Sequence, residues 1–491
     1  AANKMISRRK YDDAARLLDE AEAAKVDRLK IAQTRLKLYQ HTEEHDLART
    51  VLETVLAIDP SRLNFVLAAG NLALELDAVA DVKGYVELAS LISAKDHRVL
   101  ELNAQLSEYE RDYGQAMHLV GIACRERRAN SLTDDLRSNW RHFRLSAATG
   151  EREEARAAFG RLVSGLHQLL PPEVVPWKGT DLSDQRVLLL PRGGPGDELR
   201  TLQVVGRRLS QKGTTMGFLG DARMREIFHL NFPNGEFIEN PIAGSKLRSE
   251  QISQVNLPRL QPGSIEMARR LGIFVRANVF ERFEQVIYAD DGVLQTVLPD
   301  VLSSIEPCDE PLQLPSAAHA RAEEVLFGLE GEGPVVTISW RGSYFSPNRP
   351  SSAFLHISEL GPILRNQGVR FLDTHPNSSD KELAEIEELN GVRILRPKSE
   401  NFRDDLALLG AIMCKARANI VPPVTQRDLA AAVGAPNIWS FDVIPGISEA
   451  WRVNPKTQSD LWQPHILHHT ERHYGSRAEV VAALARRVAA L

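Results

Sequence analysis

The sequence predicts a multidomain protein in which an all-α part built from helical repeats precedes two α/β domains. Three observations predict this fold class: an uneven distribution of proline, a self-similarity at a fixed period, and an alternation of strand-like and helix-like segments after residue 186. The chain has 491 residues. Since a domain usually holds about 100–200 residues, there is enough chain for several hydrophobic cores.

Composition excludes some classes of protein. The 60 Lys and Arg against 65 Asp and Glu give a net charge of −5, whereas proteins that coat nucleic acid usually carry a basic excess. No apolar run is long enough to predict a transmembrane helix, and no signal segment opens the chain, so we expect a cytoplasmic protein. The first residue is Ala rather than Met, which is compatible with a longer natural chain. Three widely spaced cysteines predict neither a disulfide framework nor a zinc finger.

Proline marks a change of architecture along the chain. Residues 1–165 contain one of the 26 prolines, Pro60, and seven of the 31 glycines. A proline inside a helix costs about 3 kcal/mol, because it removes a hydrogen bond and clashes with the preceding turn. This proline-poor part therefore permits long helices, and the architecture is expected to change near 166–185.

The helical part repeats itself. Four segments align on a small residue, at Ala14, Ala48, Ala116 and Ala155, and the numbers of these residues differ by 34, 68 and 39. A degenerate repeat would fill the gap near residue 82. A step of this size is typical of tetratricopeptide (TPR) repeats, which are pairs of antiparallel helices with a period of about 34 residues; an irregular bundle with accidental spacing is the alternative. Since such solenoids present a concave surface to another protein, we expect this part to recognise a protein acceptor.

After a Pro-rich linker or docking segment (166–185), strands and helices alternate. Strands are expected at 186–190, 214–220, 284–289, 335–340, 369–374, 392–397, 418–423 and 437–442, and helices at about 197–212, 316–328, 352–366, 379–389, 404–416, 426–434 and 477–490. Strands separated by helices indicate right-handed βαβ units and a parallel sheet. The predicted domains are a TPR-like part (1–165), the linker, an acceptor-side Rossmann-like domain (186–310), a donor-binding one (311–475) and a carboxy-terminal helix (476–491).

Open α/β sheets bind ligands outside the carboxyl ends of their strands. This rule selects the loops Arg192–Asp197, Trp340–Arg349, Thr374–Asn377, Pro397–Lys398 and Pro422–Arg427. In the first of these, glycines precede Asp197, which is either a helix-capping carboxylate or a general base facing the cleft. The loop lacks the GxGxxG pattern, so a dinucleotide site is not expected.

The loops of the second α/β half favour a phosphate ligand. Arg341 and Arg349 flank a turn after a buried strand, and two guanidinium groups there suit a diphosphate; surface arginines on a solvated loop are the alternative. Thr425 begins a helix, whose free N–H groups favour an anion; a plain capped helix is the alternative. The same loops make Lys398, Gln426 and Arg427 donor-binding candidates.

The pattern RGG-x-GD-E-L, followed by W-R-G-S…N-R and T-x-x-x-L-A-x-A-x-G-x-P, resembles that of bacterial TPR-containing glycosyltransferases of the GT-B fold, a grouping similar to heptosyltransferases and O-GlcNAc transferases. The resemblance implies a nucleotide-sugar donor held by the carboxy-terminal half, a protein acceptor such as flagellin, and inverting transfer without a metal or a cofactor. It places Asp197 in the family's glycine-aspartate loop, Trp340-Arg341-Gly342 in its W-x-G loop and Thr425 on its donor-phosphate helix. The chain departs from the family at Asp428, where a His is usual.

A second resemblance concerns the donor. Asp290-Asp291-Gly292 and His375-Pro376 are similar to the acidic-acidic-Gly and His-Pro motifs of bacterial sialyltransferases. This resemblance implies Asp291 as an alternative base, His375 at the donor phosphate, and a CMP-linked nonulosonic acid as donor. Two other functions stay open: a capsule or lipopolysaccharide glycosyltransferase, and a non-catalytic TPR scaffold that has kept the fold.

A histidine-rich segment near the carboxyl end, HILHHTERH, could suggest a metal site. Without an established helix phase or partner carboxylates it is interpreted as a polar surface stretch, and Trp451 and Trp462 are interpreted as packing residues.

Overall fold

The computed structural model describes residues 2–7, 10–24, 26–42, 44–76, 78–129, 136–168, 170, 174–192, 194–240, 277–298, 310–342, 354–366, 368–375, 378–397, 400–442, 452–454 and 456–491. Two compact units make up the chain, Ala1–Thr133 and Asp134–Leu491.

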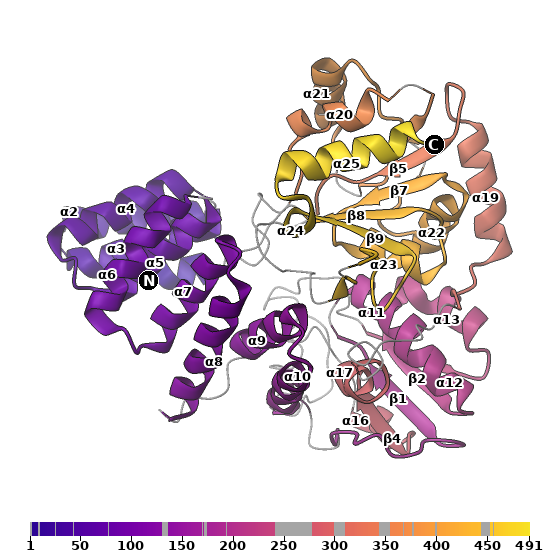
Figure 1. Ribbon diagram of the computed structural model, residues 1–491, viewed down its shortest axis with the longest axis horizontal. Coiled ribbons are helices and arrows are strands. Elements are labelled where there is room, and N and C mark those ends of the chain that lie inside the picture. Colours follow the sequence, from indigo (N-terminus) through magenta and orange to yellow (C-terminus); the bar gives the residue numbers. More distant parts are fainter. Residues whose placement is uncertain are drawn as a thin grey trace. The chain divides into compact units, whose positions relative to one another are not determined.

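Among the described residues, ten helices precede the first strand, and they follow one another along the chain (Figure 1). They are α1 (Ala2–Ser7), α2 (Tyr11–Ala23), α3 (Arg28–Thr42), α4 (His45–Ile58), α5 (Leu63–Glu75), α6 (Val79–Ser93), α7 (His97–Tyr109), α8 (Tyr113–Ala129), α9 (Leu136–Thr149) and α10 (Arg152–His167). The first residues of α2, α4, α6 and α8 are Tyr11, His45, Val79 and Tyr113, whose numbers rise by a constant step of 34. From α8 to α10, which begins at Arg152, the step is 39. The predicted period is therefore a structural period.

Small side chains sit where the repeat needs close contact. Ala14, Ala48, Ala116 and Ala155 are fully buried, and Val82 takes the equivalent position in α6. The side chain of Arg98 on α7 donates to Asn64, 34 positions earlier, at 2.6 Å. The first eight helices lie in the first unit, whereas α9 and α10 belong to the second, with the α/β part.

The first sheet contains β1 (Arg186–Leu190), β2 (Thr215–Gly220), β3 (Glu236–Glu239) and β4 (Gln285–Tyr288). All its pairs are parallel, in the order β3-β2-β1-β4. Because strands of a parallel sheet are covered on both faces, β1 is buried from Val187 to Leu190. Its helices are α11 (Pro195–Thr201), continued by a π-helical turn (Leu202–Gly206) and α12 (Arg207–Gln211), then α13 (Arg225–Asn231), α16 (Ala277–Phe280) and α17 (Ala289–Gly292).

The second sheet contains β5 (Val335–Ile338), β6 (Arg370–Asp373), β7 (Ala418–Val421), β8 (Ile438–Asp442) and β9 (Ile466–Thr470). It is parallel throughout, in the order β6-β5-β7-β8-β9. Its helices are α19 (Ser316–Phe327), α20 (Gly361–Leu364), α21 (Asp380–Asn390), α22 (Leu406–Lys415), α23 (Thr425–Ala432), α24 (Glu471–Tyr474) and α25 (Arg477–Ala489).

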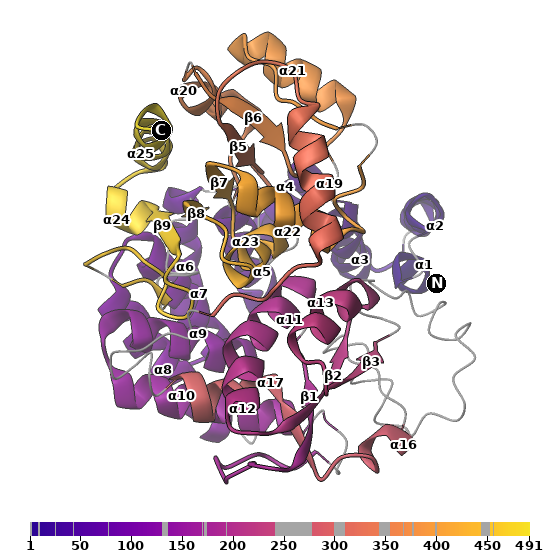
Figure 2. The same cartoon turned by 90° about the vertical axis from the view of Figure 1, so that its right-hand side faces the viewer.

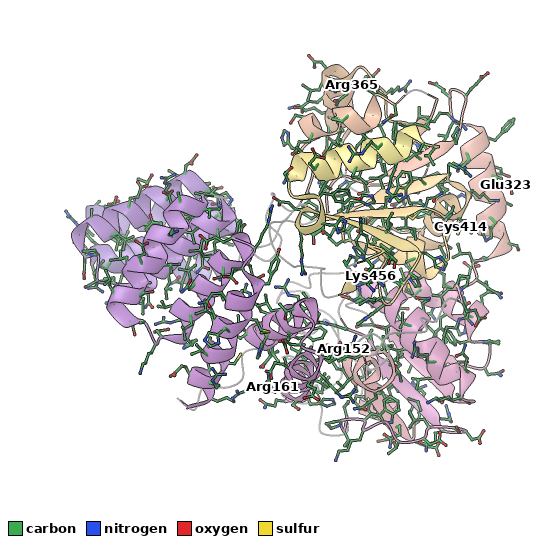
Figure 3. All side chains as sticks on the ribbon, in the orientation of Figure 1. Arg152, Arg161, Glu323, Arg365, Cys414 and Lys456 are labelled. Carbon is green, nitrogen blue, oxygen red and sulfur yellow. The ribbon has the colours of Figure 1, made fainter. Side chains whose placement is uncertain are left out.

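Helices cover both faces of the second sheet. In Figure 2, α20 and α25 lie on one face and α19 and α22 on the other. Figure 3 labels Glu323 on α19 and Cys414 on α22, and the neighbouring Lys415 donates to Glu323 at 2.6 Å. Side-chain caps begin three of these helices, since Ser379, Asp405 and Ser476 each accept a backbone N–H of the first turn, as N-cap residues do.

The predicted fold class is confirmed: helical repeats precede two Rossmann-like domains, the pair of parallel sheets that the GT-B resemblance implies. The segment 166–185, expected to be a linker or to dock, buries Leu170, Val174, Trp177 and Leu182 in the core that also contains β1. Among the described residues, no helix is both long and apolar enough to cross a bilayer.

Four local predictions differ from the structure. The expected strand 392–397 makes one bridge, Leu395 with Leu372, because the exposed Arg393 and the N–H-less Pro397 limit the ladder on either side. The expected helix 352–366 is, in its described part, a 3-10 turn (Ile357–Glu359) and the short α20. The sequence did not predict β3 or β9. The interpretation of the histidine-rich segment as a polar surface stretch is wrong for its middle part, because Ile466–Thr470 forms β9, in which His468 and His469 are buried. His465 and His473, on either side of β9, are exposed.

Candidate functional site

Two of the loops selected from the sequence meet in the structure. The loop after β1 leads into α11 and the loop after β7 leads into α23, and these two helices pack against each other. A Cβ added to Gly196 would lie 3.1 Å from the Cα of Thr425 and 3.0 Å from Oδ2 of Asp428. The carboxyl edges of both sheets thus converge where a Cβ at position 196 would be tightly packed.

Asp197 lies in the first turn of α11, and its side chain is 38% exposed. Its carboxylate forms an ion pair with Arg200 of the same helix. The guanidinium group of Arg200 also donates to Asp428 of α23, at 3.3 Å. Asp197 is therefore accessible to solvent, and Arg200 links the two α/β domains through its contact with Asp428.

Asp428 is the residue that departs from the resembling family. Its Oδ1 accepts from Arg427 at 3.1 Å and lies 4.0 Å from Nη1 of Arg452. With Arg200, three guanidinium groups surround this buried carboxylate. A carboxylate among three cations has favourable Coulomb energy, and a histidine at this position would not provide that energy.

Arg452 extends this network to β9. Its Nε lies 2.6 Å from Oδ2 of Asp460, and Nε2 of His468 lies 2.9 Å from the same oxygen. Arg452 and the two hydrogen bonds hold the pKa of Asp460 well below its usual range in spite of burial. The guanidinium carbon of Arg200 lies 5.6 Å from the centroid of the Trp462 ring, and that of Arg452 lies 5.5 Å from it. Trp462 is thus a packing residue as predicted, with cation–π contacts in addition.

Trp340, Arg341 and His375 come together at the carboxyl end of the second sheet. Nε1 of Trp340 donates to Oε1 of Glu382 at 2.9 Å, and Arg341 binds both oxygens of that carboxylate at 2.9 and 2.7 Å. A bidentate guanidinium–carboxylate pair is strong and directional. Glu382 of α21 therefore occupies the hydrogen-bonding face of Arg341 that the sequence assigned to a diphosphate. Gly342 packs against Phe354, 2.9 Å from an added Cβ.

His375 is buried next to this pair. Its ring stacks on Trp340, with centroids 5.8 Å apart. Burial, aided by the charge of Arg341, lowers the pKa of His375 to about 4. Asp373 accepts the backbone N–H of His375 at 2.7 Å, and burial raises the pKa of Asp373 to about 6. The imidazole is therefore neutral near pH 7.

The start of α23 connects these two groups of residues. Thr425 is half-buried at the first position of the helix, while Gln426 and Arg427 are buried. The amide of Gln426 donates to the carbonyl of Thr374 at 3.2 Å, next to His375. The end of β6 and the start of α23 are thereby held together.

The two aspartates after β4 have different surroundings. Asp291 accepts from His167 of α10 at 2.5 Å, and Asp290 lies 3.6 Å from Arg192, which follows β1. Burial raises the pKa of both carboxyl groups, and Arg192 offsets part of the rise at Asp290. Sequence reasoning selected Asp291, but Asp290 is the aspartate that faces the loop after β1.

Two predicted donor-binding residues, Arg349 and Lys398, lie outside the described residues, as does Trp451. Sequence reasoning missed the contributions of Trp140, His167 and Arg452, which come from segments far from the motifs, and of Arg200, which directly follows the RGG-x-GD-E-L pattern. Arg192 and Asp290 had a local signal, because both stand in strand-end loops.

No family model matches the chain. Protein FlbA of Caulobacter vibrioides is 23% identical over 312 residues, covering 61% of this chain and 46% of that protein, so the chain spans about half the length of this curated relative. Similar solved structures are a glycosyl transferase family 9 protein of Veillonella parvula (TM-score 0.40, 11% identity, 64% of this chain and 99% of that one) and the ADP-heptose lps heptosyltransferase II of E. coli (0.36, 11%, 62% and 98%). A third is an O-GlcNAc transferase of Thermobaculum terrenum (0.34, 13%, 94% and 89%). These similarities are too low to indicate a function, which has to be inferred from the residues of this chain.

Proposed function

We propose that the protein is a glycosyltransferase that transfers a sugar from a nucleotide-sugar donor to a hydroxyl group of a protein acceptor. The helical repeats would recognise that acceptor, and transfer would proceed with inversion and without a metal ion. Flagellin is the acceptor that the resembling family suggests. The motifs W-R-G and T-x-x-x-L-A, on which the resemblance rests, lie in the second α/β domain.

One observation carries the proposal: the loops that start α11 and α23 are in van der Waals contact at Gly196 and Thr425, although these residues are far apart in the sequence. A donor held by one sheet and an acceptor held by the other would meet at this junction, because ligands bind at the carboxyl edges of open α/β sheets. A site formed by one α/β domain alone would not require the carboxyl edges of two sheets to face one another.

The chemistry needs one base and one anion site. The base takes the proton of the acceptor hydroxyl, whose oxygen forms the new bond to the anomeric carbon while the bond from that carbon to the donor phosphate breaks. The nucleotide leaves with the negative charge. N–H groups at the start of α23 would stabilise that charge, with Thr425, Gln426 and Arg427 beside it.

Asp197 is the better supported of the two candidate bases. Its carboxylate is 38% exposed and stands at the junction, whereas the side chain of Asp291 is 2% exposed and bonded to His167. A base has to reach the hydroxyl directly or through one water. The donor-binding roles of Trp340, Arg341, Gly342, Arg349, His375 and Lys398 are part of the proposal. Trp340 and Arg341 already donate to Glu382, so a ligand that binds to either of them would have to share these donors with Glu382 or displace it.

If the donor is a CMP-linked nonulosonic acid, His375 would contact its phosphate group. A neutral imidazole can still donate one hydrogen bond to a phosphate oxygen. Transfer to capsule or lipopolysaccharide is an alternative acceptor chemistry. A non-catalytic scaffold is the third possibility, and the observation that favours it is Asp428, which places a carboxylate near the proposed donor-phosphate helix.

Thermal denaturation with UDP-, GDP-, ADP- and CMP-sugars tests the proposal. A bound donor raises the free energy of unfolding by RT ln(1 + [L]/Kd), about 2.7 kcal/mol at a hundred times Kd. Mass spectrometry after incubation with the donor that binds would identify transfer to protein or to saccharide. No stabilisation by any donor would leave the scaffold as the surviving hypothesis.

Asp197→Asn tests the base. Loss of a general base typically lowers turnover about 10²–10⁴-fold, while the donor-induced shift in Tm should stay unchanged. Asp380→Asn is the matched control, since Asp380 is an exposed carboxylate in the first turn of α21. Turnover of Asp197→Asn within a few-fold of wild type would reject Asp197 as the base.

A further inference from the structure

β1 and β4 are neighbouring strands, paired from Val187 with Gln285 to Leu190 with Tyr288. Their carboxyl ends therefore release the next residues at the same edge of the sheet, where Nη1 of Arg192 lies 3.6 Å from Oδ1 of Asp290. The two side chains form an acid–base pair that is long for a hydrogen bond.

Each partner keeps hydrogen-bonding capacity. Within the described part of the chain, Oδ2 of Asp290 has no hydrogen-bond partner, although its side chain is only 3% exposed. Such a buried acceptor costs free energy until a donor reaches it. The side chain of Arg192 is 34% exposed, so a ligand that arrives from solvent at Arg192 is within reach of Asp290.

The helix pair α9–α10 holds this edge from outside the sheet. Trp140 of α9 has its ring centroid 4.6 Å from the guanidinium carbon of Arg192. A guanidinium group over an indole face is held by the cation–π attraction, so Trp140 restricts the direction in which Arg192 presents its N–H groups.

His167, the last residue of α10, holds the neighbouring turn. Its Nε2 lies 2.5 Å from Oδ2 of Asp291, and its Nδ1 lies 3.3 Å from the carbonyl oxygen of Val174. Both ring nitrogens of His167 therefore have a hydrogen-bond partner. Because Asp290 is the adjacent residue, a fixed Asp291 fixes the turn that carries Asp290.

Packing supports a role for this helix pair within the α/β unit. Phe143, Phe159 and Leu162 belong to the same core as β1 and β4. Polar contacts also join the two helices, since Arg161 on α10 (Figure 3) contacts His142 and Asn139 of α9 at 3.2 and 3.4 Å. The helix pair α9–α10, which continues the repeat in the sequence, therefore packs against this edge of the sheet.

We propose that Arg192 and Asp290 bind the backbone of the acceptor peptide beside the modified hydroxyl residue, with Trp140 and His167 as positioning residues. A peptide group offers a carbonyl that accepts from Arg192 and an N–H that donates to Asp290, so it satisfies both members of the pair. The inference rests on the proposed function and specifies its acceptor site.

Arg192→Met tests the contact residue, because methionine keeps an apolar stem against Trp140 but has no N–H donors. Arg186→Met is the matched control, since Arg186 is at the opposite end of β1 and also stacks on an aromatic ring, Phe283, at 5.5 Å. We expect kcat/KM for a peptide acceptor to fall at least tenfold in Arg192→Met and less than twofold in Arg186→Met. The donor-induced shift in Tm should be the same in both.

His167→Ala and His167→Gln separate positioning from mere stability. Glutamine can still donate to Asp291, so it should restore most of the kcat/KM that alanine loses, with donor binding unchanged in both. Equal kcat/KM for wild type, Arg192→Met and His167→Ala would overturn the inference and leave the proposed function intact. Transfer to saccharide acceptors alone would overturn the peptide site, and absence of transfer by the wild type would overturn both proposals.

Discussion

Glu198, next to the candidate base, is a carboxyl group with no exposed surface. Its Oε2 accepts the backbone N–H of Asp221 at 2.8 Å, while its Oε1 has no partner in the described structure. Burial raises the pKa of Glu198 from 4.5 to about 8. The group is therefore protonated at neutral pH in the folded protein and ionised in the unfolded chain.

Between pH 4.5 and about 8 the folded state thus binds one more proton than the unfolded chain, so the free energy of unfolding falls as pH rises. We predict that Glu198→Gln removes this loss, which is on the order of several kcal/mol because one pKa unit corresponds to about 1.4 kcal/mol. Denaturant unfolding across this range should show a flatter profile for the variant and higher stability than wild type at pH 8. Glu226→Gln, an exposed residue of α13, is the control; parallel profiles for Glu198→Gln and wild type would contradict the prediction.

Sequence reasoning selected loops that meet in the structure, but it did not predict which of their residues contact one another. Asp290 and Asp291 stand in the same motif, and only the approach of His167 and Arg192 distinguishes them. Both partners come from distant parts of the chain, so no local pattern could assign them. Asp428 was likewise read as a departure from a motif, whereas its three arginine neighbours give it a structural reason.

At the scale of elements, the contact between α11 and α23 depends on Gly196. We predict that Gly196→Ala destabilises the protein by about 1–3 kcal/mol, the usual cost of forcing extra volume into a packed interface. Gly194→Ala is a control in the same loop, because a Cβ there would meet nothing within 4 Å. Chemical denaturation of both variants tests this, and equal stability of the two would show that the helices can separate without cost.

The same contact depends on charge. We predict that Asp428→Ala costs about 1–3 kcal/mol, because three guanidinium groups lose a buried acceptor, while Arg200 and Arg452 keep Asp197 and Asp460. Glu330→Ala is the control, since Glu330 forms an exposed pair with Arg393, and such pairs contribute at most about 1 kcal/mol. Urea unfolding of the two variants distinguishes these cases, and similar midpoints would contradict a structural role for Asp428.

Most strands and helices followed from their sequence patterns, and the exceptions have a common cause. β1, β8, α21 and α25 combine a buried apolar pattern or a capping residue with their expected length. β9 does not, because its interior holds His468 and His469, whose partners include Asp460 and Arg487 from other segments. Burial of polar residues depends on partners from other elements, which a local pattern does not contain.

At the scale of the whole molecule, proline content and packing place the main boundary differently. The proline-poor sequence ends near residue 165, whereas the compact units meet after Thr133. Proline content reports which segments can be helical, but it does not report which core a helix joins. Phe143 and Phe159 join the α/β core.

This difference yields a prediction about fragments. A chain from Asp134 to the carboxyl end should fold and keep the donor-induced shift in Tm, because it retains the whole second unit. A chain that begins at Gln185 lacks α9, α10 and the buried Trp177, which contribute to the core around β1. We expect the shorter fragment to aggregate or to melt at a lower temperature in calorimetry. Equal stability of the two fragments would show that α9 and α10 are dispensable.

The constant spacing of helix starts from α2 to α8 has a consequence for how this chain can change over generations. Duplication or loss of one whole period between Tyr11 and Ala129 leaves every remaining helix with a neighbour of the same kind. A single recombination event can therefore lengthen or shorten the recognition array. The longer step to α10 marks where this freedom ends, since α9 and α10 contribute Phe143 and Phe159 to the core that also contains β1.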